Sequence, residues 1–432
     1  MFNVKGTQPV IRTEIIAGVT TFLTMAYVMV VNPLVLSQGG VPFEQAFTAT
    51  IIATLAGTLL MAFFANYPIA IAPGMGLNAY FTYSLALTHK GMDYHVAFSA
   101  VFISAILFVI LSLTPLRSKL IEIIPDNLKH AIGAGIGLFI AFIGLRLTGL
   151  VKADPSTIVT LGDLHTLPVI LAIIGLVVTL IFMVLNIRGA LFIGMLVTGI
   201  IAYFTGQIHF TKGIVSLPNL PAGLVAYNPI TAVSDIIHYG LYGAVFSFLL
   251  VTLFDTTGTI LGLGKQAGLM EGEKLPRAER ALFADSAATL IGSIFGTSPT
   301  SAYLESAAGI SAGGRTGLTA LVVAILFAIA AFFTPIISAI SGVEAITGPA
   351  LIIVGSLMIS NVRHIIWDND EAFPAFLVIL AMPLTSSIAT GLALGFIFYP
   401  LLKVVRGKWR EVHPLIYIFG LLFLIQLAFF QH

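Results

Sequence analysis

The chain has 432 residues, of which 58% are hydrophobic and only 9% are charged, and its mean hydropathy is +1.03. A soluble core does not require so large an apolar fraction, so the composition predicts a protein embedded in a lipid bilayer. The net charge of +1 gives no reason to expect a nucleic-acid partner. The absence of cysteine excludes disulfides and thiolate metal sites.

Apolar runs of about 17–25 residues, the length that crosses a hydrocarbon layer as a helix, recur from Glu14 onward. They predict an all-α polytopic membrane protein. Residues 1–13 are too short and polar for a cleavable signal, so the first span is expected to act as an uncleaved targeting signal. Fourteen transmembrane spans are predicted, at 14–37, 46–66, 69–87, 95–114, 131–150, 167–185, 190–206, 241–264, 281–297, 298–311, 316–335, 347–361, 373–385 and 387–403.

The distribution of basic residues predicts the orientation of these spans. With a cytoplasmic N-terminus, sixteen of the 20 lysines and arginines fall in inside segments and four in outside segments, as the positive-inside rule requires. Reading 373–403 as one span would move four basic residues outside, so two short spans are favoured there. The segment 413–431 is then an additional helix, either interfacial or spanning.

The fourteen spans divide into two groups of seven that are expected to be inverted repeats. The two groups start at about 14 and 241, and Pro73 and Pro299 interrupt the third and tenth spans at nearly the same offset. Parallel interruptions in the two halves of a transporter indicate a binding site near the bilayer midplane.

Each interruption is expected to join an extended segment to a half-helix. Pro73 and the two glycines that follow it, Gly74 and Gly76, predict a strand that becomes helical near Asn78. In the other half, Ser298 is the expected helix cap, Pro299 the first turn, and Glu305 lies about two turns further in. Such backbone must line a protein cavity, where the helix starts offer free N–H groups.

Two carboxylates, Asp255 and Glu305, lie in these apolar stretches. Acids at bilayer depth are costly and usually mark a substrate or ion pathway, so these residues are the candidate site. The alternative for Asp255 is a structural hydrogen bond to a neighbouring threonine, and for Asn78 a helix-packing amide. Asp285, near the inner end of its span, is expected to have a cap or interface role.

Two motifs suggest other functions and are set aside. The run 133–137, Gly-Ala-Gly-Ile-Gly, is similar to a dinucleotide-binding glycine loop, but no soluble strand precedes it. Small residues that pack transmembrane helices explain it better. The run 255–259, Asp-Thr-Thr-Gly-Thr, is similar to the phosphorylated loop of ion-pumping ATPases but lacks its lysine, and no loop is large enough to bind nucleotide. No enzyme activity is expected, whereas an ion channel or a sodium-coupled carrier of another small solute stays open as an alternative.

Four blocks together resemble the azaguanine-permease branch of the nucleobase-cation symporter family, which includes hypoxanthine, guanine and adenine permeases. The resemblance covers essentially the whole chain up to about residue 405. The blocks are Thr21-Phe22-Leu23-Thr24-Met25-Ala26-Tyr27 with Asn32-Pro33, Ala72-Pro73-Gly74-Met75-Gly76-Leu77-Asn78-Ala79-Tyr80-Phe81, Leu253-Phe254-Asp255-Thr256-Thr257-Gly258-Thr259, and Thr297-Ser298-Pro299-Thr300-Ser301-Ala302-Tyr303-Leu304-Glu305-Ser306.

The resemblance implies a uracil-permease-like fold in which a core domain moves as an elevator against a gate domain, often within a homodimer. Residues 1–130 and 241–345 would form the two halves of the core. Residues 131–240 and 346–432 would form the gate and the C-terminal helix. The residues carried over by motif are Asn78, Asp255 and Glu305 as essential polar groups, and more loosely Tyr80 as a ring contact, Thr259 facing the site, and Leu304 lending backbone to the base.

The chemistry of the acids fits a purine nucleobase. In guanine the ring N1–H and the exocyclic amino group lie side by side, so the Glu305 carboxylate can accept both in strong hydrogen bonds. Asp255 would hold the opposite edge and the coupling proton, although the two acids titrate as a pair and the proton is not assigned to one. The expected function is proton-coupled purine uptake in the plasma (inner) membrane, with no metal and no cofactor besides H⁺. The preferred purine, the stoichiometry and the oligomeric state stay open.

Overall fold

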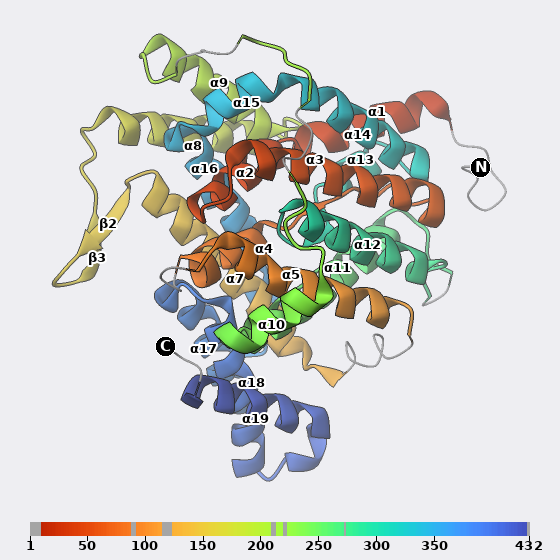
Figure 1. Cartoon of the computed structure of the whole chain (residues 1–432), viewed down its shortest axis with the longest axis vertical. Helices are drawn as coiled ribbons and strands as arrows, with labels where there is room; N and C mark the ends of the chain where they lie inside the picture. Colours follow the sequence, from red (N-terminus) through yellow and green to blue (C-terminus); the bar gives the residue numbers. More distant parts are fainter. Residues whose placement is uncertain are drawn as a thin grey trace.

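The computed structural model describes residues 10–87, 92–114, 123–208, 213–218, 223–271 and 274–429. The two ends of the chain, which belong to the expected domain halves 1–130 and 346–432, lie outside the described residues. The described chain is almost entirely helical (Figure 1). Its elements are α1 (Ile11–Met25), α2 (Val28–Gln38), α3 (Phe43–Leu60), η1 (Met61–Ala65), β1 (Ile71–Pro73), α4 (Met75–Ala79), η2 (Tyr80–Ala86), α5 (Tyr94–Ser112), α7 (Asp126–Leu147), β2 (Val151–Asp154), β3 (Ile158–Leu161), α8 (Leu167–Val184), α9 (Ala190–Phe204), α10 (Pro229–Tyr239), α11 (Tyr242–Gln266), α12 (Ala278–Phe295), β4 (Thr300–Ala302), α13 (Ser306–Ser311), α14 (Gly317–Ala330), η3 (Ala331–Phe333), α15 (Thr334–Ser341), α16 (Glu344–Met358), η4 (Ile359–His364), α17 (Asn369–Thr385), α18 (Ile388–Val405), η5 (Trp409–Glu411) and α19 (Pro414–Phe429).

The predicted all-α polytopic architecture is confirmed. Within the described residues, nine helices or joined helices are long and apolar enough to cross a bilayer. The first of them, Ile11–Gln38, is broken between α1 and α2 at Ala26 and Tyr27. Half-length and short helices make up the remaining apolar segments, and the count of fourteen spans stays a prediction.

The two predicted interruptions form one structure, a short antiparallel ribbon in which β1 pairs with β4. Ile71 lies opposite Ala302, and Pro73 lies opposite Thr300. The ribbon is extended by two backbone hydrogen bonds, from Gly74 N to Pro299 O at 2.9 Å and from Tyr303 N to Ala70 O at 3.0 Å. Backbone groups at bilayer depth are thereby paired between two segments more than 200 residues apart in the sequence.

The ribbon corrects the expected positions of the half-helices. Pro73 belongs to β1, and α4 begins at Met75, so Asn78 lies in its first turn. In the second half, Ser298 is no cap and Pro299 does not open a helix, because the chain stays extended through Ala302 and α13 begins only at Ser306. Glu305 occupies the N-cap position instead of lying two turns inside the helix. Strand pairing, a non-local interaction, overrides the local helix-start signal of the proline.

Most of the long helices pack in two groups (Figure 1), and the ribbon lies against the first of them. The first group contains α1, α3, α5, α11, α12 and α14, and the second contains α7, α8, α16, α17 and α18. The predicted role of the glycines at 133–137 in helix packing is confirmed in the second group. A Cβ on Gly135 would lie 2.7 Å from Met382 Sδ, and one on Gly137 would lie 2.8 Å from Gly355 O, so the backbones of these helices approach closely.

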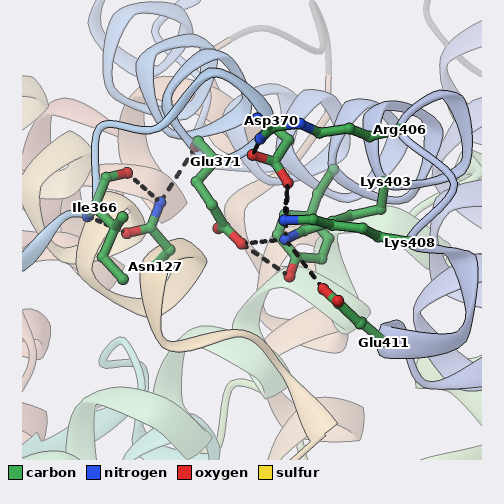
Figure 2. A network of polar contacts seen from close by, with 9 residues as sticks. Asn127, Ile366, Asp370, Glu371, Lys403, Arg406, Lys408 and Glu411 are labelled. Atoms are coloured by element: carbon green, nitrogen blue, oxygen red, sulfur yellow. Dashed lines mark hydrogen bonds and ion pairs between the residues drawn. The ribbon is translucent and has the colours of Figure 1, made fainter.

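The segment predicted as two short spans at 373–403 forms a helical hairpin, α17 and α18, that turns at Ser386. An ion network closes its open end (Figure 2). Lys403 Nζ lies 3.2 Å from Asp370 Oδ2 and 2.6 Å from Glu371 Oε1, and Arg406 also pairs with Asp370. The Lys403 and Asp370 side chains are only 7% and 3% exposed, so the attraction between the two charges is needed to offset the cost of burying them.

The helix at 413–431, left open as interfacial or spanning, is described as α19 to residue 429 and runs antiparallel to α18. Gly420 packs against the backbone of Phe396 in α18, and Gln426 covers Gly243 at the start of α11. The Phe246 ring lies 5.2 Å from that of Phe423. Figure 1 places the end of α19 on the side of the β2–β3 hairpin and the start of α1 on the opposite side. Because α18 is a candidate span, the packing of α19 along it favours the spanning alternative.

This geometry predicts opposite labelling for two single-cysteine variants, Arg410→Cys before α19 and Ala428→Cys at its end, both at exposed positions. A membrane-impermeant maleimide should label Ala428→Cys from outside intact cells and Arg410→Cys only in inverted vesicles. Labelling of both from one side would mean that α19 lies along the membrane surface.

The ion network predicts unequal costs for two lysine substitutions. Lys403→Met leaves two acids without their buried partner, and such broken pairs cost about 3–5 kcal/mol in the free energy of unfolding. The matched control is Lys129→Met, which removes a pair with the 85% exposed Asp126, and exposed pairs are worth about 0–1 kcal/mol. Thermal unfolding in detergent compares them, and equal losses of stability would contradict the buried network.

Candidate functional site

Asp255 and Glu305 come from different elements and meet beside the ribbon. Asp255 lies in the middle of α11, which packs against both β4 and α13. Glu305 follows β4 directly. The two carboxylates are close enough to interact electrostatically, and Ser301 of β4 lies within hydrogen-bonding reach of Asp255. The structure thus brings together the two acids that the sequence singled out.

Tyr27 fixes the Glu305 side chain and was not identified from the sequence. It lies at the break between α1 and α2, and its hydroxyl donates to Glu305 Oε1 at 2.7 Å. Thr24 also donates to the Glu305 backbone carbonyl at 3.3 Å. On the other side of the ribbon, the Tyr303 hydroxyl donates to Pro73 O at 2.6 Å. The break between α1 and α2 therefore places the Tyr27 phenol against the Glu305 carboxylate.

Asn78 is held by a chain of buried amides and hydroxyls. Its Nδ2 donates to Asn32 Oδ1 at 2.8 Å, and Asn32 Nδ2 in turn donates to Thr50 Oγ1 and Thr297 Oγ1 at 2.8 and 2.9 Å. Both asparagines are 0% exposed. Within the described part of the chain, Asn78 Oδ1 has no hydrogen-bond partner. A buried acceptor without a partner is costly, so an additional donor at this atom would be stabilising.

The three residues carried over more loosely differ in their surroundings. Thr259 is buried one turn from Asp255, and Leu304, beside Glu305, is 59% exposed. Tyr80 is buried and packs edge-on against Phe248, with 4.9 Å between ring centroids. Phe248 precedes Asp255 by about two helical turns. Thr259 and Leu304 therefore lie at the level of the acids, whereas Tyr80 packs further along α11.

A third acid, Asp285 in α12, connects the two elements that carry the site. It is 0% exposed. Its Oδ2 accepts a hydrogen bond from Thr256 at 2.5 Å, and its Oδ1 accepts one from Thr300 at 2.8 Å. The interface role expected for Asp285 agrees with these contacts. However, Thr256 adjoins Asp255 and Thr300 begins β4, so the interface that it joins is the site itself. The signal in the sequence was an acid within an apolar helix, as for Asp255.

The side chains beside the ribbon offer mainly hydrogen-bond acceptors. Two carboxylates and the free Asn78 oxygen are arranged around the ribbon, and no lysine or arginine is among the side chains that form it in the described structure. No group of three or more His, Cys, Asp or Glu residues suited to a metal ion occurs among the described residues. Such a set of acceptors fits a neutral solute that carries several N–H donors.

Comparisons with known proteins agree with this fold. A profile of the Permease family (Xan_ur_permease) matches residues 12–394. The chain is 63% identical to the guanine/hypoxanthine permease PbuO and 48% identical to the guanine/hypoxanthine permease PbuG, both of Bacillus subtilis (strain 168), covering 99% and 100% of this chain and 99% of each relative. The transmembrane domain of a cyanobacterial bicarbonate transporter, BicA, matches with a TM-score of 0.62 at 17% identity, over 88% of this chain and 97% of that one.

The BicA likeness concerns the fold alone, whereas the two sequence relatives extend over the whole chain. The expected inverted-repeat transporter architecture is therefore confirmed. So is the resemblance to the nucleobase-permease branch that the four sequence blocks indicated. The chain is a multi-pass membrane protein and belongs to the Permease family.

Proposed function

We propose that the chain is a proton-coupled carrier that takes up purine nucleobases, guanine and hypoxanthine foremost, into the cell across the plasma membrane. The observation that carries the proposal is the meeting of Asp255 and Glu305 beside the ribbon, between two half-helices. The names of PbuO and PbuG, both guanine/hypoxanthine permeases, support the same substrate class. The orientation of the basic residues supports a cytoplasmic N-terminus.

The site suits the polar edges of a flat base. The Tyr27 hydroxyl orients Glu305 through Oε1, and the carboxylate retains lone pairs for the adjacent N1–H and amino group of guanine. Asn78 Oδ1 is free to accept a further N–H. The exposed Leu304 side chain beside Glu305 gives the ring an apolar surface. Adenine does not present an N1–H beside its amino group as guanine does. The preference among purines is measured by comparing the uptake of guanine, hypoxanthine and adenine directly.

Proton coupling follows from the charge of the site. A neutral purine leaves the negative charge of Asp255 and Glu305 uncompensated, and moving an uncompensated charge through a bilayer is costly. A proton bound together with the purine lowers this charge, so the loaded carrier moves more readily. An inward membrane potential adds about 2.3 kcal/mol per charge per 100 mV to the driving force.

The motion is proposed to be an elevator, in which the group of helices around the ribbon slides against the group containing α7, α16, α17 and α18. As part of the same proposal, the first packing group is assigned to the core halves 1–130 and 241–345, and the second to the gate halves 131–240 and 346–432. Small residues at their contact support sliding: Gly76 of α4 lies so close to Ile136 of α7 that it leaves no room for a Cβ. A homodimer formed through the gate is part of the same proposal.

Neutralising either acid should abolish concentrative uptake. Asp255→Asn and Glu305→Gln keep the side-chain volume, so both should fold and reach the membrane but lose more than about 90% of accumulation of radiolabelled guanine. Proteoliposomes with and without an inward proton gradient supply the measurement. A sodium gradient and a purine-free electrical recording test the sodium-coupled carrier and the channel. Accumulation at the wild-type level in both variants would remove the two acids from the mechanism.

Asp285 is proposed to position the site without touching the purine. Asp285→Ala leaves the Thr256 hydroxyl without its acceptor, at about 1–3 kcal/mol, and removes one of the partners of the Thr300 hydroxyl, which keeps the backbone carbonyl of residue 285 and Thr289. It should weaken guanine binding about tenfold or more, and Asp285→Asn, which keeps an oxygen acceptor, should recover part of that loss. Guanine affinity is measured by ligand-induced thermal shift, which separates binding from folding. A destabilised Asp285→Ala with unchanged affinity would make Asp285 a folding residue only.

A further inference from the structure

The face of α11 that carries Asp255 differs in exposure along the length of the helix. Towards the end of the helix, this face contains Gly258, Gly262 and Gln266, which follow Asp255 by three, seven and eleven residues and therefore lie on its side. All three are exposed. A Cβ added to Gly258 or Gly262 would meet no atom within 4 Å. The structure is thus open beside Asp255 in this direction.

Towards the start of α11, before Asp255, the same face is buried. Val251 and Thr252 are 3% and 2% exposed, and Phe248 is 0% exposed. The Phe248 ring is covered by Tyr80, which is itself 3% exposed. One continuous helix face is therefore sealed before Asp255 and open after it. The boundary between the two parts lies at the acid.

The open part faces water and not lipid, on two grounds. Asp255 is itself partly exposed on this face, and a carboxylate directed into hydrocarbon would be costly. Leu304 is 59% exposed beside Glu305, so the space extends past the second acid. The open face ends at Gln266, whose Nε2 donates to Ser311 Oγ of α13 at 3.0 Å. This is the end of the bundle where α1 begins, because Gly313 lies so near Thr13 that a Cβ added to it would come within 2.5 Å of that side chain.

We propose that the structure is the cytoplasm-open state and that the purine leaves along α11, past Gly258 and Gly262. The two glycines keep this route wide, while the Phe248 and Tyr80 rings form the barrier towards the outside. The identity of the leaving molecule rests on the proposed function. The aqueous route itself does not, so the two are tested separately.

The absence of cysteine from the chain makes the test direct. Gly258→Cys and Gly262→Cys should react with a charged, membrane-impermeant methanethiosulfonate in inverted vesicles, and Val251→Cys, on the same face but buried, should react at least tenfold more slowly. If the two glycine positions react only with a neutral, lipid-soluble maleimide, the face is turned to lipid and the route is wrong. If Val251→Cys reacts as fast as they do, there is no barrier at Phe248.

Guanine supplies the second measurement. Protection of Gly258→Cys by guanine supports a purine route, whereas fast labelling without protection by any purine would leave the aqueous opening intact and contradict the proposed substrate. A third variant, Gly262→Leu, replaces a poor helix former by a good one and so should not unfold α11. It should slow guanine uptake at least fivefold with unchanged guanine affinity. Unchanged uptake would show that the purine leaves elsewhere.

Discussion

The pairing of β1 with β4 is the constraint on which the rest of the structure depends. Extended backbone in a bilayer has no water to bond with, so each strand is stable there only against the other. Because β1 and β4 belong to different halves of the sequence, their pairing fixes the two halves relative to each other. It also sets where helix can resume, at Met75 and at Ser306, and thereby the depth of Asn78 and Glu305.

The polar contacts around the ribbon then follow from its position. Tyr303, just beyond β4, bonds back to Pro73 of β1, and Thr300 at the start of β4 bonds to Asp285. Thr256 brings α11 to the same carboxylate. Asp285 therefore connects the helix with one acid to the strand that leads to the other. The distance between Asp255 and Glu305 is held by these hydrogen bonds as well as by helix packing.

The sequence predicted the parts of this arrangement that depend on local chemistry. Pro73 and Pro299 indicated the two interruptions, and hydrophobic length indicated the helices. It did not predict that the interruptions pair, because strand pairing across the 231 positions from Ile71 to Ala302 leaves no local pattern. The helix start expected at Pro299 was wrong for this reason. Tyr27 was missed since a tyrosine in an apolar span has no distinctive signal, and its role depends on a break that only the fold reveals.

A site built from carboxylates carries negative charge, whereas a site built from amides would be neutral. An asparagine or glutamine can accept a hydrogen bond without adding charge to the site, as the unpartnered Asn78 oxygen would. Glu305 accepts more strongly, but it brings a negative charge close to that of Asp255, in surroundings without a basic side chain among the described contacts. On the proposed mechanism, a neutral base leaves this charge in place. The proton that accompanies the purine is then a requirement of how the purine is recognised, because the same acids that bind its N–H groups must be partly neutralised before the carrier moves.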